Sequence, residues 1–161
     1  MRVELEDVLF WMDAIRDSKD RYRTLESFWK GQIRSKEWLV SCLEQIVNKE
    51  PKNISIHAGW NGTLASLIFN SAINVNHIES IDIDPKCAET ANKVCRRQNM
   101  AGKFYAKTAD IVKYYTPEQF DIVINTSCEH LTDEDLRTWY KNLPARSLIV
   151  CQSNNLYDLN E

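Results

Sequence analysis

The sequence predicts an α/β protein with a doubly wound, mostly parallel sheet of about five strands behind an N-terminal helical cap. From residue 53 onward, short apolar runs alternate with segments of helical periodicity. Strands that alternate with helices form parallel β-α-β units with right-handed crossovers. Before residue 50 the apolar residues recur only at helical spacing. We therefore assign residues 1–50 to the cap and 51–161 to the core, and expect one compact unit.

The N-terminal cap is expected to consist of helices that end before Pro51. Apolar residues recur at helical intervals over 3–16 and again over 25–47. Gly31 is expected to divide the second stretch, with Ser35 as the N-cap of its later half. Proline cannot continue a helix, so Pro51 and the polar residues around it mark the start of the core.

Five strands and three helices are expected in the core. The expected strands span 53–58, 77–83, 103–107, 120–125 and 147–152, and the expected helices span 62–73, 85–99 and 132–142, with a short turn near 111–119. Asp84 before Pro85 is an N-cap followed by proline at the first helical position. Residues 116–119 carry a capping-box pattern and residues 132–135 carry its aspartate variant, in agreement with the expected turn and helix.

Composition excludes several classes of site and partner. The five cysteines contain no C-x-x-C pair and the three histidines stand far apart, so no metal site is predicted. The net charge of −3 gives no overall attraction to nucleic acid or to an anionic membrane. No apolar run approaches the roughly 18–20 residues that span a bilayer, and the acidic N-terminus lacks a signal-peptide pattern. We expect a cytoplasmic protein with reduced thiols and no membrane partner.

Glycines and acids follow the predicted strands at the edge where open α/β sheets bind nucleotide-like cofactors. Gly59 and Gly62 follow the first strand and permit close approach of the backbone. Asp82 ends the second strand, where a carboxylate accepts hydrogen bonds from both hydroxyls of a ribose; Asp84 already supplies the helix cap. Asp110 ends the third strand and either accepts a hydrogen bond from an adenine amine or caps a turn.

Residues 54–65, 81–85, 108–110 and 120–131 resemble, in order and spacing, the successive motifs of class I S-adenosylmethionine-dependent methyltransferases, which have a Rossmann-like fold. The resemblance covers residues 53–152, about three fifths of the chain, and implies S-adenosylmethionine as the cofactor. The residues that it places at the cofactor are His57, Gly59, Trp60, Gly62, Asp82, Ile83, Asp110, Ile111, Asn125 and Thr126. By this resemblance the glycine turn lines the methionine part, Asp82 holds the ribose, and Asp110 with Ile111 frames the adenine.

The sequence departs from the family pattern at two places. His57 stands where the first motif usually has an acid, and only Gly59 and Gly62 remain of three alternating glycines, with Trp60 beside them. Trp60 either packs over the cofactor or plugs its site. The family's last two strands are missing, so the fifth strand is expected to be an edge. Exposed edges tend to be covered or paired. We therefore expect a homodimer through this strand, or cover from the N-terminal helices or the tail.

Methyl transfer requires alignment of the acceptor and sometimes removal of a proton, so catalytic residues are hard to read from sequence. His130 is a candidate general base because the ordinary pKa of histidine is about 6.5; alternatively it only begins a helix. Asn125 is the second candidate, because the resemblance implies that it faces the cofactor and the acceptor from the fourth strand. The Asn/Asp-Pro-Pro-aromatic box of enzymes that methylate planar amino groups is absent after it. We interpret Cys128 as a packed thiol rather than a nucleophile.

Residues 19–36 contain six basic and two acidic residues, together with Tyr22, Phe28 and Trp29. Such a segment binds phosphates and stacks bases, or it forms a solvated helix face with its aromatic rings in the core. Since N-terminal helices of the family often cover the cofactor pocket, Gln32, Arg34 or Lys36 could instead reach the cofactor carboxylate.

The prediction is a methyltransferase acting on a small-molecule or nucleic-acid acceptor. The alternative is a methyltransferase-like module without catalysis that serves in binding or assembly, which the altered glycine motif and the short sheet favour. A dehydrogenase is disfavoured because the turn is not G-x-G-x-x-G.

Overall fold

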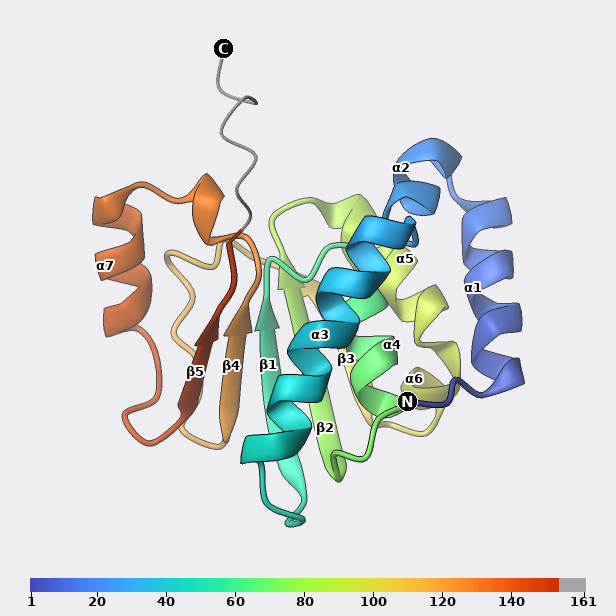
Figure 1. The fold of residues 1–161 in the computed structure, drawn as a ribbon. Helices are drawn as coiled ribbons and strands as arrows, with labels where there is room; N and C mark the ends of the chain where they lie inside the picture. The colour runs from blue at the N-terminus through green and yellow to red at the C-terminus, as the bar shows by residue number, and fades with distance from the viewer. Residues whose placement is uncertain (154–161) are drawn as a thin grey trace.

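Five parallel strands form the centre of the molecule, in the order β3-β2-β1-β4-β5 (Figure 1). The structure is a computed structural model that describes residues 1–153; residues 154–161 of the predicted core lie outside the described part. The strands are β1 Lys52–His57, β2 Val75–Asp82, β3 Phe104–Thr108, β4 Ile122–Asn125 and β5 Leu148–Cys151. The helices are α1 Leu5–Asp17, α2 Arg21–Glu26, α3 Lys30–Ile46, α4 Thr63–Phe69, α5 Pro85–Val94, α6 Arg96–Met100 and α7 Asp133–Lys141, with a 3-10 turn η1 at Cys128–His130. The predicted α/β fold with a parallel five-stranded sheet is confirmed.

Two apolar clusters cover opposite faces of the sheet. The larger joins Ile54 and Ile56 of β1 to Leu39 of α3 and to residues of α4 and α5. The smaller joins Val123 of β4 to Trp139 of α7. Helices therefore flank both faces, and the chain switches face between β1 and β4, the neighbouring strands at the centre of the sheet. In open α/β sheets this switch point is where ligands bind.

Two local predictions in the N-terminal cap were wrong. Gly31 does not divide a helix, because it is the second residue of α3, and Ser35 lies inside that helix; the break falls at residues 27–29. Residues 111–119 form turns as expected, and the Thr116 hydroxyl lies 3.2 Å from His57 Nε2. The Asp84 cap and the capping box at Thr132 are both present.

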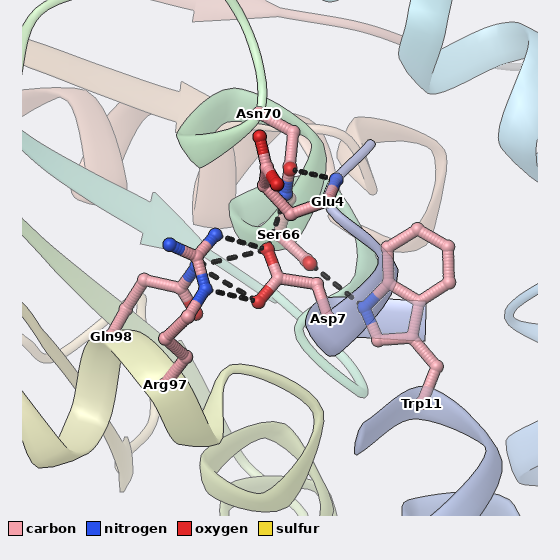
Figure 2. A network of polar contacts seen from close by, with 7 residues as sticks. All are labelled: Glu4, Asp7, Trp11, Ser66, Asn70, Arg97 and Gln98. Atoms are coloured by element: carbon pink, nitrogen blue, oxygen red, sulfur yellow. Dashed lines mark hydrogen bonds and ion pairs between the residues drawn. The ribbon is translucent and has the colours of Figure 1, made fainter. Parts of the chain in front are cut away.

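A buried carboxylate fixes α1 to the core (Figure 2). Asp7 accepts two hydrogen bonds of 2.7 Å from Arg97 of α6, one of 2.7 Å from Asn70 and one of 3.1 Å from Gln98. Trp11 also donates its indole N–H to Ser66 Oγ of α4 at 2.8 Å. These contacts bind the first helix to two helices of the core, while the division of the chain at residue 50 stays a prediction.

Candidate functional site

The ends of β1, β2 and β3 are joined by hydrogen bonds around Asp82. The backbone N–H of Trp60, in the turn after β1, donates to Asp82 Oδ2 at 3.0 Å, and the N–H of Asp84 donates to Oδ1 at 3.0 Å. The N–H of Ala109, just after β3, donates to the Asp82 carbonyl at 3.0 Å. A carboxylate offers about four lone-pair sites. The half-buried Asp82 side chain therefore keeps acceptor capacity for hydroxyl donors.

Each glycine of the turn after β1 is required by packing. A Cβ at Gly59 would lie 2.0 Å from Ser80 Oγ of β2, so only glycine allows the turn to touch that strand. Gly62 has φ +79°, and a Cβ there would lie 3.0 Å from the Cβ of Ala91 on α5. Ala58 and Trp60 also have left-handed φ values, of 53° and 49°. Left-handed backbone at residues other than glycine is strained, and such strain concentrates at functional sites.

His57 is fully buried beneath this turn, on the α7 face of the sheet. Trp139 donates its indole N–H to His57 Nδ1 at 2.7 Å, so Nδ1 is an acceptor and the proton sits on Nε2. Nε2 lies 3.1 Å from Ser55 Oγ and 3.2 Å from Thr116 Oγ1. Burial and the charge of Lys107 lower the pKa of His57 to about 4, so the ring is neutral. Because both nitrogens contact protein atoms, we leave His57 out of the proposed cofactor site.

The segment after β4 separates a buried amide from an exposed imidazole. Asn125 is fully buried, is in register with His57 of β1, and accepts a hydrogen bond of 2.9 Å from Ser127 N–H through Oδ1. Thr126 is half-buried. His130 is 73% exposed in its side chain and lies 3.8 Å from Glu129. The two predicted catalytic residues therefore differ: Asn125 is a fixed part of the strand end, and His130 stands in solvent.

The acid and apolar residues predicted around the adenine lie in three different environments. Asp110 accepts a hydrogen bond from Val112 N–H at 3.0 Å and lies 3.5 Å from Lys113 Nζ, as a turn-capping aspartate does. Ile111 is buried in the core cluster with Trp139. Ile83 is 70% exposed directly after Asp82, and its side chain is available to a planar ring.

Sequence reasoning did not single out two buried polar residues of the turn, Asn61 and Thr63. Within residues 1–153, Asn61 Nδ2, Thr63 Oγ1 and Asn125 Nδ2 are buried without a hydrogen-bond partner. An unpartnered buried polar atom costs about 1–3 kcal/mol, so such atoms mark places where a ligand or water completes the bonding. All three atoms belong to residues at the ends of β1 and β4, on the two sides of the switch point.

Lys36 places a buried ammonium at the same end of the sheet. It is 9% exposed and donates to Gln32 Oε1 at 2.7 Å, and burial lowers its pKa to about 8. It lies one turn before Val40, which packs in the same core cluster as Ile54 and Ile56 of β1. Because α3 runs antiparallel to the strands, that turn is nearer the strand ends (Figure 1). Ser35 beside it accepts a hydrogen bond of 3.1 Å from Gln152, just after β5.

The cap also touches the second strand end. Arg23 of α2 lies 2.5 Å from the carboxylate of Asp84. A hollow between α1, α2 and α5 reaches Asn61 but has a volume of about 30 Å³, room for one water-sized group. A larger hollow of about 300 Å³ lies between α1 and α5 and contains none of the strand-end residues. The first hollow is too small for the predicted cofactor, and the second lies away from the strand ends where the cofactor is predicted.

No protein-family model matches the sequence, and no curated protein sequence matches it. Solved structures do match its fold. Mitomycin 7-O-methyltransferase superposes with a TM-score of 0.66, at 11% identity, over 89% of this chain and 42% of the enzyme. A geranyl diphosphate methyltransferase in complex with S-adenosylmethionine gives 0.64, at 12% identity, over 88% and 58%. The PH0226 protein of Pyrococcus horikoshii gives 0.65, at 17% identity, over 88% and 68%.

The fold is that of class I S-adenosylmethionine-dependent methyltransferases. The resemblance seen in the motifs is thereby confirmed at the level of the Rossmann-like methyltransferase fold. The chain spans between 42% and 68% of the length of these three structures. In the described residues no helix is long and apolar enough to cross a membrane, and no three His, Cys, Asp or Glu side chains are grouped as metal ligands.

Proposed function

We propose that the protein binds S-adenosylmethionine at the carboxyl ends of β1, β2 and β4 and transfers its methyl group to an acceptor. The proposal rests on one observation: a carboxylate with free acceptor sites and two buried amide donors without partners lie at the same edge of the sheet. Asp82 keeps lone pairs for hydroxyls, while Asn61 and Asn125 each hold a buried N–H₂ without a partner. S-adenosylmethionine presents two ribose hydroxyls and a carboxylate, so its donors and acceptors complement this set.

Each part of the cofactor has candidate residues. Asp82 would accept from the ribose hydroxyls, and Ile83 would cover one face of the adenine, with Asp110 near its amine and Ile111 beneath. The methionine part would follow Gly59, Trp60 and Gly62 toward Asn125 and Thr126. The buried ammonium of Lys36 and the amide of Asn61 would hold the carboxylate.

The cofactor supplies a methyl group that its sulfonium already activates. The chain's own contribution is to orient the acceptor and to exclude water. Asn125 would position the acceptor through its unpaired amide N–H₂. His130, exposed on η1, is reachable by a bound acceptor and would take up its proton.

Calorimetry with S-adenosylmethionine, S-adenosylhomocysteine and NAD tests this proposal. We expect both sulfur cofactors to bind at micromolar concentration and NAD not to bind. Preference for NAD would support a dehydrogenase, and no binding at sub-millimolar concentration would remove the enzyme proposal. If the cofactor binds but no acceptor is ever methylated, the non-catalytic module is favoured; a His130→Ala variant with unchanged turnover would remove the proposed base.

Two exposed aromatic residues favour a nucleic-acid acceptor over a small molecule. Phe28 packs against Trp11 with ring centroids 5.2 Å apart, but Tyr22 and Trp29 are 83% and 69% exposed. They lie in the basic segment 19–36, and exposed rings among basic residues stack bases along a charged strand. Fluorescence polarisation with a labelled single-stranded oligonucleotide tests this, with the double variant Tyr22→Ala and Trp29→Ala. Absence of binding by the parent protein would favour a small acceptor.

We also propose that two copies pair through β5, which is an edge of the sheet in the described residues and carries Leu148 at 38% exposure. Sedimentation of the full chain tests this. A monomer at all micromolar concentrations would contradict it.

A cytoplasmic location is proposed because all five cysteines are free thiols. Imaging of the tagged protein tests this location.

A further inference from the structure

Two thiols meet beside the proposed site. Cys151 ends β5 and is in register with Asn125 at the end of β4. Cys128 begins η1, and its Sγ lies 3.5 Å from the Asn125 carbonyl oxygen. The N–H of Gln152, next to Cys151, donates to the same carbonyl at 2.9 Å. One carbonyl therefore holds both cysteine segments and brings the end of β5 beside the start of η1.

The two thiols differ in access to solvent. Cys151 is exposed and Cys128 is half-buried. Burial, together with the neighbouring Cys151, raises the pKa of Cys128 to about 12, so this group stays a protonated thiol. An oxidant from solvent therefore meets Cys151 first, and Cys128 is placed to react second. The other three cysteines, Cys42, Cys87 and Cys95, lie on α3, on α5 and at the end of α5.

We propose that Cys128 and Cys151 are a modification site at which hydrogen peroxide forms a reversible disulfide. The Cys151 thiolate attacks one peroxide oxygen, the O–O bond breaks, and Cys151 becomes a sulfenic acid while hydroxide leaves. The Cys128 thiol then gives its proton to the departing hydroxide as its sulfur attacks the sulfenic sulfur, so that the S–S bond forms and the S–OH bond breaks with loss of water. The departing hydroxides take up the two thiol protons. The thiols lose two electrons and two protons, and peroxide is reduced to two waters; a dithiol reductant reverses the change.

The disulfide would join the start of η1 to the end of β5, across the segment that holds Asn125. This consequence rests on the proposed function. Fixing η1 against β5 restrains Thr126 and His130 at the acceptor side of the site, so oxidation changes the affinity for S-adenosylmethionine by several-fold.

Peptide mapping of the full chain after peroxide treatment tests the site. We expect a Cys128–Cys151 peptide pair that is two hydrogens lighter than the reduced pair and that dithiothreitol restores. Cys151→Ser and Cys128→Ser each abolish it, and the matched control Cys42→Ser retains it. Accumulation of sulfinic acid at Cys151 without the pair, or a mixture of pairings, would overturn the proposal.

A second measurement needs no oxidation. The reduced protein is treated with a bifunctional bimane that fluoresces only after alkylating two thiols, and we expect strong fluorescence that both serine variants lose. Weak labelling of the folded parent would mean that the thiols do not meet. Calorimetry of reduced and oxidised protein completes the design. Equal affinity removes the coupling to the site and leaves the disulfide, whereas no binding by reduced protein removes the proposed function alone.

Discussion

Two buried polar clusters of this molecule use their hydrogen-bonding groups in opposite ways. In the cluster around Asp7, both carboxylate oxygens receive donors from Arg97, Asn70 and Gln98, although one amide oxygen, Gln98 Oε1, lacks a partner (Figure 2). At the strand ends, by contrast, the amide nitrogens of Asn61 and Asn125 have no partner.

The backbone differs in the same way. The Asp7 cluster stands on helices α1, α4 and α6, whereas the turn after β1 holds Ala58 and Trp60 at left-handed φ values. A cluster whose charges are matched inside the protein stabilises the fold. Unpaired buried donors and a strained backbone lower the free energy of unfolding, and a ligand that pairs with those donors raises it again. We therefore propose that the first cluster serves folding and the second serves binding, and the predictions below test the two roles.

The largest effect is expected from Asp7→Ala. Removing Asp7 leaves the buried amides of Asn70 and Gln98 without this acceptor, at about 1–3 kcal/mol each in the free energy of unfolding, whereas Arg97, 38% exposed in its side chain, can turn to water. Burial alone would raise the pKa of Asp7, but the hydrogen bonds from Arg97, Asn70 and Gln98 outweigh it and hold the pKa below its usual range. Urea unfolding at neutral pH measures the loss. On the same helix, Asp13→Ala breaks only an exposed pair with Arg16 and should leave the urea midpoint close to that of the parent.

An Asp7→Ala variant within about 1 kcal/mol of the parent would contradict the structural role of this cluster. Cofactor affinity, measured on the folded fraction, should stay unchanged.

The next effect is a loss of stability in acid that belongs to His57. The folded-state pKa of about 4 lies below the ordinary 6.5, so the unfolded chain binds the proton first. The stabilising contribution is therefore complete above about pH 6.5 and is lost as the pH falls from 6.5 toward 4, by up to about 3 kcal/mol. Urea midpoints across this range measure it. His57→Gln should flatten the profile, and an unaltered profile in this variant would assign the acid loss to other groups.

The fold could be predicted from local rules because each rule agreed with the final packing. Ile54 and Ile56 lie in a buried strand, as their apolar character predicts. Asp84 is the N-cap of α5 and Pro85 is its first residue, which is the usual order at a helix start. Gly31 was misread because a glycine in the first turn of a helix interrupts few hydrogen bonds.

The site was only partly predictable. Asp82 and the turn after β1 were expected to meet from their spacing, and the Trp60 N–H does bond the Asp82 carboxylate. The role of His57 depends on its hydrogen bond with Trp139, which lies 82 residues later in the chain, so no local sequence pattern predicts it. The buried state of Lys36 and the unmet donor of Asn61 likewise arise only from packing. Spacing reveals which strand ends meet, and burial reveals which side chains there lack partners.

A smaller effect is expected on cofactor affinity in Asp82→Ala. Loss of hydrogen bonds from two ribose hydroxyls to a charged group should weaken binding by about 1–3 kcal/mol, or roughly 5-fold to 150-fold. Calorimetry measures the affinity, and a urea titration shows separately how much stability is lost with the bonds to Trp60 and Asp84. Asp133→Asn, at the start of α7, is the matched control and should bind as the parent does. Equal affinity in Asp82→Ala would withdraw the ribose assignment.

The smallest effect separates the strain of the turn from the role of its indole. Trp60→Gly relieves the strain of one left-handed residue and should raise the free energy of unfolding by about 1 kcal/mol at most. Loss of the packing of the indole ring reduces this gain. Ala58→Gly relieves a similar φ without removing a ring, so the difference between the two variants isolates the indole. If the indole packs over the cofactor, Trp60→Gly binds S-adenosylmethionine more weakly than Ala58→Gly does. Tighter binding by Trp60→Gly would mean that the indole obstructs the cofactor site instead of packing on the cofactor.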